Sequence, residues 1–151
     1  MKLIIINFSL VLALFVGLLN PSNLNAQETG LTIVGNAQSV PSEMNMNQLK
    51  SVLKGEKLRW DDGSKVVIAL MKTNTPVGTN TCNKIFNMTG DQLNKYFLAQ
   101  VFQGKVKAPN FFNSVDELES FVSRTPGAIG VLQKANDKDL ITILVDGKKQ
   151  L

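Results

Sequence analysis

The chain has 151 residues, with 16 basic and 12 acidic side chains, a single cysteine and no histidine. Without histidine the chain cannot use Ser-His-Asp or Cys-His catalysis or build the usual zinc sites, and a single cysteine cannot form an internal disulfide. The net charge of +4 is modest and the lysines are scattered, which argues against nucleic-acid binding but is compatible with a weak general attraction for anions.

The first 26 residues have the features of a secretory signal peptide. Lys2 precedes an almost continuous apolar run over 3–19, a helix-breaking segment at 20–23, and Ala26 at a position suited to cleavage. We therefore expect a signal peptide at 1–26, a periplasmic or secreted location, and no membrane span after cleavage. The alternative is an uncleaved anchor, because the run approaches the lower limit of about 17 residues for a spanning helix. No cysteine stands directly after the run, at the cleavage region, so a lipoprotein anchor is not expected.

Residues 27–151 are expected to form one α/β domain. The predicted elements follow the order β-α-β-α-α-α-β-β, over residues 31–35, 44–53, 66–71, 75–87, 89–102, 114–124, 128–132 and 140–145. The strands are short apolar or β-branched runs, and the helices have apolar residues at helical spacing. Helix-start signals stand at Thr75-Pro76, Thr89 and Ser114, and Pro126 ends the last helix. This order predicts helices packed on a small mixed sheet.

The first candidate ligand site is the strand-to-helix junction at residues 72–78. Free backbone N–H groups at a helix start, together with the positive end of the helix dipole, attract anions. The candidate binding residues at this junction are Thr73, Asn74, Thr75, Val77 and Gly78. The alternative interpretation is that Thr75 only caps its helix and that the rest of the turn is solvated.

The second candidate is the turn at 125–130, where the Thr125 hydroxyl and backbone N–H groups near Gly127 could reach the same ligand from the other side. Gly127 permits a positive φ and a close approach to bare backbone. The alternative is a structural turn whose glycines allow a helix to pack tightly on a strand. The two candidates support each other only if they face one crevice. Ligands of open α/β sheets favour the carboxyl ends of strands, where the first candidate lies.

The sequence does not predict an enzyme, because it has no paired carboxylates, no nucleophile–base pair and no phosphate-binding P-loop. We predict no catalytic residue, no metal site and no cofactor. Asp61-Asp62 is expected to form a turn, and the acidic side chains at 116, 117 and 119 are expected to be solvated at a helix start. Residues expected to be buried or to pack against the core are Trp60, Cys82, Phe111 and Phe112.

Several motifs, in the same order along the chain, resemble the substrate-binding proteins of phosphate transporters. Segment 48–63 resembles that family's "helix, F-x-G-K, W-x-dG" segment, and Thr75-Pro76-Val77 at a helix start resembles its phosphate-binding Ser-Gly-Thr turn. Tyr96, segment 101–105 and the turn at 125–130 extend the likeness over about residues 31–131.

The resemblance implies a fold like one lobe of a type 2 periplasmic binding protein. It also implies a secreted or periplasmic solute-binding-like protein that binds phosphate or another small anion, with an envelope transport component or protein as partner. Pro76 has no N–H, Val77 has no hydroxyl, and Gly78 stands where short relatives often have Arg, so weak or altered binding is expected. The alternative is a domain that has lost its ligand and serves as an interaction module of the cell envelope.

Overall fold

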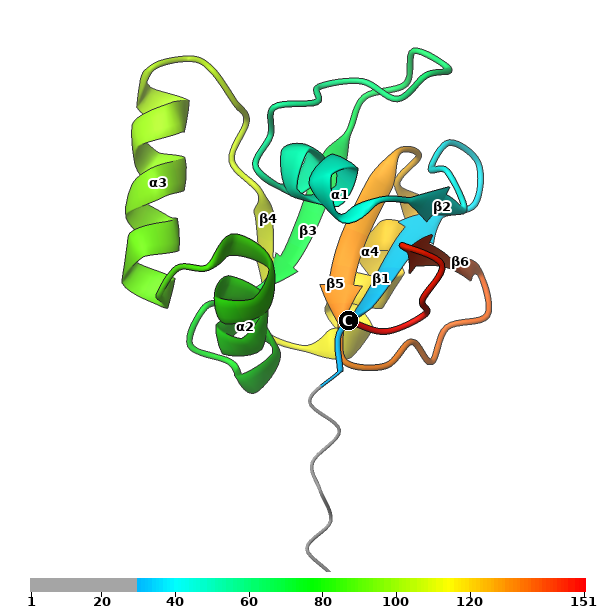
Figure 1. Ribbon diagram of the computed structural model, residues 1–151. Coiled ribbons are helices and arrows are strands. Elements are labelled where there is room, and N and C mark those ends of the chain that lie inside the picture. The colour runs from blue at the N-terminus through cyan, green and yellow to red at the C-terminus, as the bar shows by residue number, and fades with distance from the viewer. Residues whose placement is uncertain (1–29) are drawn as a thin grey trace, which may run out of the picture.

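The structure, a computed structural model, describes residues 30–151 and contains a six-stranded mixed sheet (Figure 1). The strands are β1 (Thr32–Asn36), β2 (Glu43–Met44), β3 (Val67–Met71), β4 (Asn110–Phe112), β5 (Ala128–Leu132) and β6 (Leu140–Val145). Their order in space is β2-β6-β1-β5-β3-β4. Strand β1 is antiparallel to β5 and β6, whereas β5 and β4 are both parallel to β3, and β2 is parallel to β6. The predicted small mixed sheet is confirmed.

Helices cover both faces of this sheet (Figure 1). They are α1 (Met46–Leu53), α2 (Pro76–Thr81), the π-helical segment η2 (Cys82–Phe86), α3 (Gly90–Phe102) and α4 (Val115–Arg124). Helix α4 packs on one face through Leu118 and Val122, which meet Val34, Ala69 and Ala128 of the sheet. Helices α1, α2, η2 and α3 contribute to a larger apolar cluster on the opposite face. Burial of apolar side chains in both clusters is the main favourable contribution to folding.

The local signals in the sequence placed most elements within one or two residues of their observed bounds. Thr75, Thr89 and Ser114 each accept a backbone N–H in the first turn of their helices, as expected for N-caps. The helix predicted over 75–87 begins as α2, continues as the π-helical η2, and ends at Asn87 with a φ of 53°. The short strands β2 and β4 were not predicted, because two or three residues carry too little periodicity to mark a strand.

Most predictions for single residues are confirmed. Trp60 and Cys82 are buried, and the rings of Phe111 and Phe112 lie in β4 and pack edgewise or tilted on Phe97 and Phe121. The prediction that the side chain of Glu119 in α4 is solvated is wrong. Glu119 is only 5% exposed, and its Oε1 accepts the backbone N–H of Asn136 at 2.6 Å, so this carboxylate fastens the loop before β6 to α4.

The predicted signal peptide at 1–26 lies outside the described residues. Within residues 30–151, no helix combines the length and the apolar character that a bilayer span requires.

Candidate functional site

The junction at residues 72–78 lies where β3 ends and α2 begins. The N–H of Lys72 donates to the carbonyl oxygen of Phe112 at 2.9 Å, so the carboxyl ends of the parallel strands β3 and β4 lie side by side there. Helix α4 begins at Val115, shortly after β4, and its N-cap Ser114 therefore follows the same edge of the sheet. Five of the predicted ligand residues, from Thr73 to Gly78, are thus together in one turn at an edge where α/β proteins commonly bind ligands.

Thr75 fixes the shape of this turn. Its Oγ1 donates to the carbonyl oxygen of Lys72 at 2.7 Å and accepts the N–H of Gly78 at 3.0 Å. The hydroxyl has one hydrogen, which is committed to Lys72, so Thr75 has no donor left for an anion unless that bond breaks. Pro76 has no N–H, and the N–H of Val77 stands in the first turn of α2, where helical geometry offers no acceptor. The capping interpretation of Thr75 is therefore confirmed, and its donation to a ligand stays a prediction.

Thr73 and Asn74 also bring polar side chains to this turn. The Oγ1 of Thr73 accepts from Nδ2 of Asn94 at 3.3 Å, and its carbonyl oxygen accepts from the hydroxyl of Thr79 at 3.0 Å. The Thr73 hydroxyl accepts in the first of these bonds, so its own hydrogen remains available to a ligand. Asn74 is exposed. Asn94 belongs to α3 and had no signal in the sequence, because its place here depends on how α3 packs.

Gly78 is required by close packing. Its Cα faces the backbone of the preceding turn, and a Cβ at this position would overlap the carbonyl oxygen of Lys72. An arginine at this position could not enter the turn without moving its backbone. Gly78 therefore contributes to the junction by letting α2 begin close to the end of β3.

The turn at 125–130 has a structural role, in agreement with the alternative interpretation of the sequence. The carbonyl oxygen of Gly127 accepts the indole N–H of Trp60 at 2.8 Å and the N–H of Val67 at 3.1 Å. Gly127 has a φ of 77°, and a Cβ there would overlap the carbonyl oxygen of Lys65. Thr125 accepts the N–H of Ala128 at its carbonyl oxygen, 3.1 Å away, and closes the turn. The turn thus joins the 57–66 segment to the sheet.

The structure does not bring the two candidate ligand motifs together. Strands β3 and β5 are parallel, with Val67 opposite Ala128, so the turn that precedes β5 lies at the amino end of β3. The junction follows Met71, four residues farther along β3, which at about 3.3 Å per residue is about 13 Å away. Thr125 and Gly127 therefore lie too far from Thr73–Gly78 for one small anion to contact both groups.

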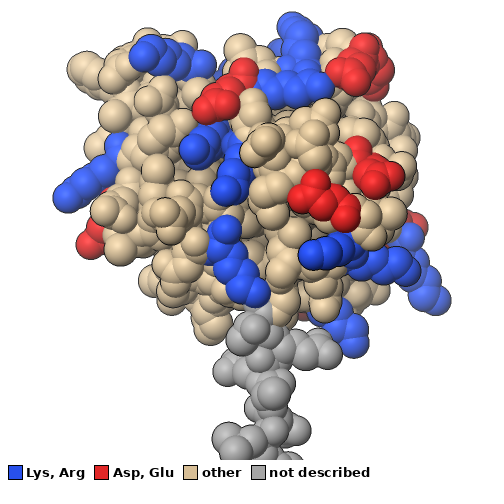
Figure 2. Space-filling model, viewed as in Figure 1, with Lys and Arg blue, Asp and Glu red and all other residues tan. Residues whose placement is uncertain are grey.

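Charge is mixed over the face of the molecule that Figure 2 shows. Figure 2 shows basic and acidic side chains interspersed over the face seen in Figure 1, in keeping with the scattered lysines of the sequence. The titratable groups with a displaced pKa lie outside the junction. Burial raises the pKa of the Cys82 thiol, burial and then the charge of Glu56 raise the pKa of Tyr96, and hydrogen bonds from Ser64 lower the pKa of Asp62. Among residues 30–151, no three His, Cys, Asp or Glu side chains are grouped so that they could hold a metal ion.

Comparisons with known proteins support the fold. No protein-family model matches the chain, and no curated protein matches it. Among solved structures, an ABC-type phosphate transport receptor from Vibrio cholerae superposes with a TM-score of 0.63 at 15% identity, covering 81% of this chain and 48% of the receptor. A putative phosphate ABC transporter substrate-binding protein from Clostridium perfringens, solved with bound phosphate, gives 0.59 at 14% identity, covering 78% and 45%. PstS from Borrelia burgdorferi gives 0.57 at 16% identity, covering 78% and 47%.

These likenesses show a mixed α/β fold of the kind found in phosphate-binding transport proteins. The chain spans less than half the length of each of the three solved structures. At 14–16% identity the similarity concerns the fold alone.

Proposed function

We propose that this chain is a secreted or periplasmic solute-binding-like protein that binds phosphate or another small anion weakly. The observation that carries the proposal is the shared fold: the three solved structures described above are all phosphate transport proteins, and each covers about four fifths of this chain. The protein would act in anion uptake with an envelope transport component as partner, and it would catalyse no reaction.

The β3–α2 junction is the proposed binding site. Thr73 would donate its hydroxyl hydrogen, Asn74 would donate its side-chain amide, and the N–H of Val77 would point at the anion from the start of α2. Weak binding is expected for two reasons. The hydrogen of the Thr75 hydroxyl is already used within the turn. The match also covers less than half of each solved structure, so a second lobe that would enclose the anion is not among the described residues.

Calorimetric titration of the protein with phosphate, in a phosphate-free buffer, tests this function. Phosphate at 100 times its dissociation constant should raise the free energy of unfolding by about 2.7 kcal/mol. Asn74→Ala should weaken binding, whereas Asn83→Ala, which removes another exposed amide, on η2, should not. If phosphate, sulfate and small carboxylates at millimolar concentration all leave both the heat signal and the stability unchanged, the protein is not an anion-binding protein of this kind.

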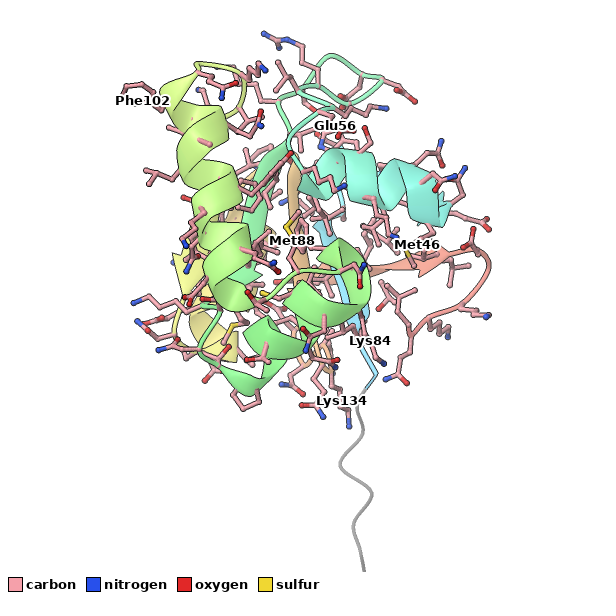
Figure 3. All side chains as sticks on the ribbon, turned by 60° about the vertical axis from the view of Figure 1, so that its left-hand side comes forward. Met46, Glu56, Lys84, Met88, Phe102 and Lys134 are labelled. Carbon is pink, nitrogen blue, oxygen red and sulfur yellow. The ribbon has the colours of Figure 1, made fainter. Side chains whose placement is uncertain are left out.

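The second candidate function is an interaction module of the cell envelope, and the outer surface of α3 favours it. Leu98 is 71% exposed, Phe102 is 92% exposed, and Val101 lies beside them on the same helix. Figure 3 shows Phe102 at the end of α3, directed away from the body of the protein. In cells that export this protein, a photo-crosslinking residue placed at Phe102 should give an adduct of one defined mass, and the same residue at Asn83 should not. Absence of an adduct at Phe102 would exclude this second function.

A further inference from the structure

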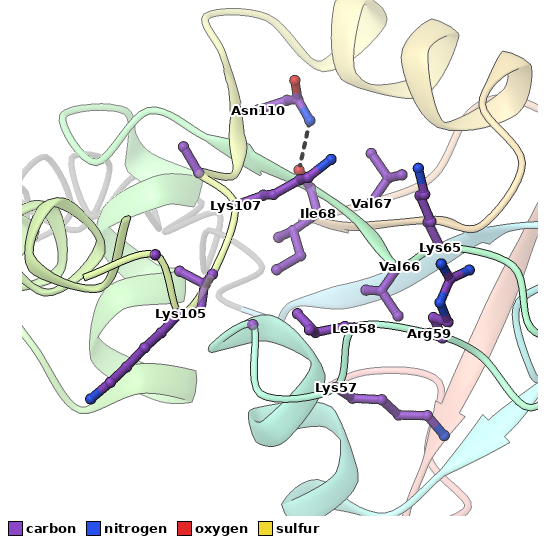
Figure 4. Close-up of a pocket in the computed structure, with 14 residues that line it drawn as sticks. Lys57, Leu58, Arg59, Lys65, Val66, Val67, Ile68, Lys105, Lys107 and Asn110 are labelled. Carbon is purple, nitrogen blue, oxygen red and sulfur yellow. Dashed lines mark hydrogen bonds between the residues drawn. The ribbon is translucent and has the colours of Figure 1, made fainter. Parts of the chain in front are cut away.

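A recess lies at the end of β3 opposite the junction. It has a volume of about 400 Å³, within the range of small-molecule pockets, and is formed by two segments that are distant in sequence, 55–68 and 104–110 (Figure 4). Val67 and Ile68 at the start of β3 and Asn110 at the start of β4 line its base. The proposed anion site follows the carboxyl ends of the same two strands, so the two sites are separate.

The chemistry of the recess is distinctive. Its lining includes five basic side chains and no acidic one: Lys57, Arg59, Lys65, Lys105 and Lys107. Lys57 forms an ion pair with Asp61 at 2.8 Å, and Figure 4 shows Lys105 directed away from the other labelled residues. Arg59, Lys65 and Lys107 make no ion pair in the described structure and border the recess. Three cations without an ion pair thus surround one opening, although charges are mixed over the face seen in Figure 2.

The floor of the recess is apolar. Leu58, Val66, Ile68 and Val106 contribute to it, and Leu58 is 57% exposed. A free inorganic anion would use the cations but not this floor. A ligand that has both an anionic group and an apolar chain would use both.

The wall that holds Arg59 and Lys65 is built rigidly. The segment 57–66 folds back on itself, with Val66 N–H donating to Leu58 and Trp60 N–H donating to Ser64, at 3.0 and 2.9 Å. Trp60 is in turn fixed to Gly127. The facing wall is held by Val106, which packs so closely on Gly55 that a Cβ there would lie 2.9 Å from the valine. Both walls are therefore formed before a ligand arrives, which lowers the entropic cost of binding.

The arrangement of Arg59 and Lys65 is unfavourable for the fold itself. They are directly opposite each other in an antiparallel bridge, and like charges in that position are destabilising. Arg59 also donates to the carbonyl oxygen of Gly63 at 2.7 Å, which holds its guanidinium at this place. An anion between the two side chains would relieve their repulsion.

We propose that this recess binds an anionic amphiphile, with a phosphate or carboxylate group between Arg59 and Lys65 and an apolar chain over Leu58, Val66 and Val106. Lys107 completes the positive rim from the facing wall. The ligand is either a free molecule or a lipid that presents the same chemistry. The proposal stands independently of phosphate binding at the junction.

Hexyl phosphate is the probe, with inorganic phosphate and hexyltrimethylammonium as comparisons, measured by calorimetry and by amide chemical shifts. We expect hexyl phosphate to bind at least about tenfold more tightly than inorganic phosphate at this site, because its chain leaves water. It should shift the amide signals of Leu58 and Val66. Hexyltrimethylammonium, which has the same chain and the opposite charge, should not bind. Equal binding of both hexyl compounds, or shifts confined to another part of the protein, would overturn the proposal.

The Arg59→Gln/Lys65→Gln variant should weaken hexyl phosphate binding by about tenfold or more while leaving the stability unchanged or raised, because it removes a repulsive pair. Lys138→Gln/Lys148→Gln removes the same charge at exposed positions outside the recess and should keep the affinity. Asn74→Ala should also keep it, which separates this site from the junction. Unchanged affinity in the Arg59/Lys65 variant would overturn the proposal.

A final arm identifies the source of the ligand. The parent protein and the Arg59→Gln/Lys65→Gln variant are each sedimented with phosphatidylglycerol vesicles. Co-sedimentation that the variant loses assigns a lipid, and hexyl phosphate binding without co-sedimentation assigns a free amphiphile. If the protein neither binds hexyl phosphate nor co-sediments with the vesicles, the inference is refuted.

Discussion

Replacing Gly127 by alanine should destabilise the protein strongly, for two reasons that can be separated. A φ of 77° costs an alanine about 1 kcal/mol relative to glycine. The new Cβ would also overlap the carbonyl oxygen of Lys65, a backbone atom that cannot swing aside. Relief of the overlap must displace the Gly127 carbonyl, which accepts from Trp60 and Val67. A buried indole N–H left without its acceptor costs about 1–3 kcal/mol, so we expect a total loss of about 2–4 kcal/mol.

Gly147→Ala is the matched control. Gly147 has a φ of 75°, but a Cβ there would meet no atom within 4 Å, so this variant has the dihedral cost of about 1 kcal/mol without the overlap. Urea unfolding of the two variants and the parent, followed by fluorescence of Trp60, the single tryptophan, gives both losses in stability. The Trp60 emission of folded Gly127→Ala should also shift. If the two variants agree within about 0.5 kcal/mol, the reasoning about close packing at Gly127 is refuted.

Three further changes have expected outcomes. Thr75→Ala should lower stability by about 1 kcal/mol in urea unfolding, because α2 loses its cap, and Thr75→Ser should restore most of it; equal losses would contradict the capping role. Asn36 donates from the end of β1 to two carbonyl oxygens at the end of α4. Asn36→Asp should therefore lower the free energy of unfolding by about 3 kcal/mol at pH 7, which is more than the loss in Asn36→Ala. Below about pH 4, where the new carboxyl is protonated, the loss in Asn36→Asp should be smaller. Burial raises the pKa of Cys82, so the unfolded state releases the thiol proton first. The stability that this thiol contributes is complete below pH of about 8.5 and is lost above it, at up to about 1.4 kcal/mol per pH unit. Subtraction of the same titration for Cys82→Ala isolates this slope, and identical curves would exclude it.

Local features of the sequence predicted most of the fold. Thr75-Pro76 and Thr89 set the starts of α2 and α3 because an N-cap depends on atoms within three residues of it. The continuous apolar run of β3 reflects its burial between helices on both faces. Strand β4 was missed, because it is short and its pairing with β3 is set by tertiary contacts.

The candidate sites were less predictable, because they depend on strand direction. Neither periodicity nor propensity shows that β5 runs parallel to β3, and that single fact separates Thr125 and Gly127 from the junction. The Trp60–Gly127 hydrogen bond joins two motifs that the sequence shows only as neighbours in order. The basic recess was missed for the same reason: its cations come from two segments that only the folded chain brings together.

The central position of β5 also bears on how the chain folds. β5 fills the space between β1 and β3, pairing Gly130 with Val34 on one side and Ile129 with Ile68 on the other. During synthesis β1 and β3 therefore emerge long before the strand that joins them, and the sheet cannot close until residue 132 is available. Contacts of such long sequence separation slow folding, to the millisecond-to-second range in small β-rich domains. The nascent chain consequently stays without its complete sheet until β5 and β6 have both been made.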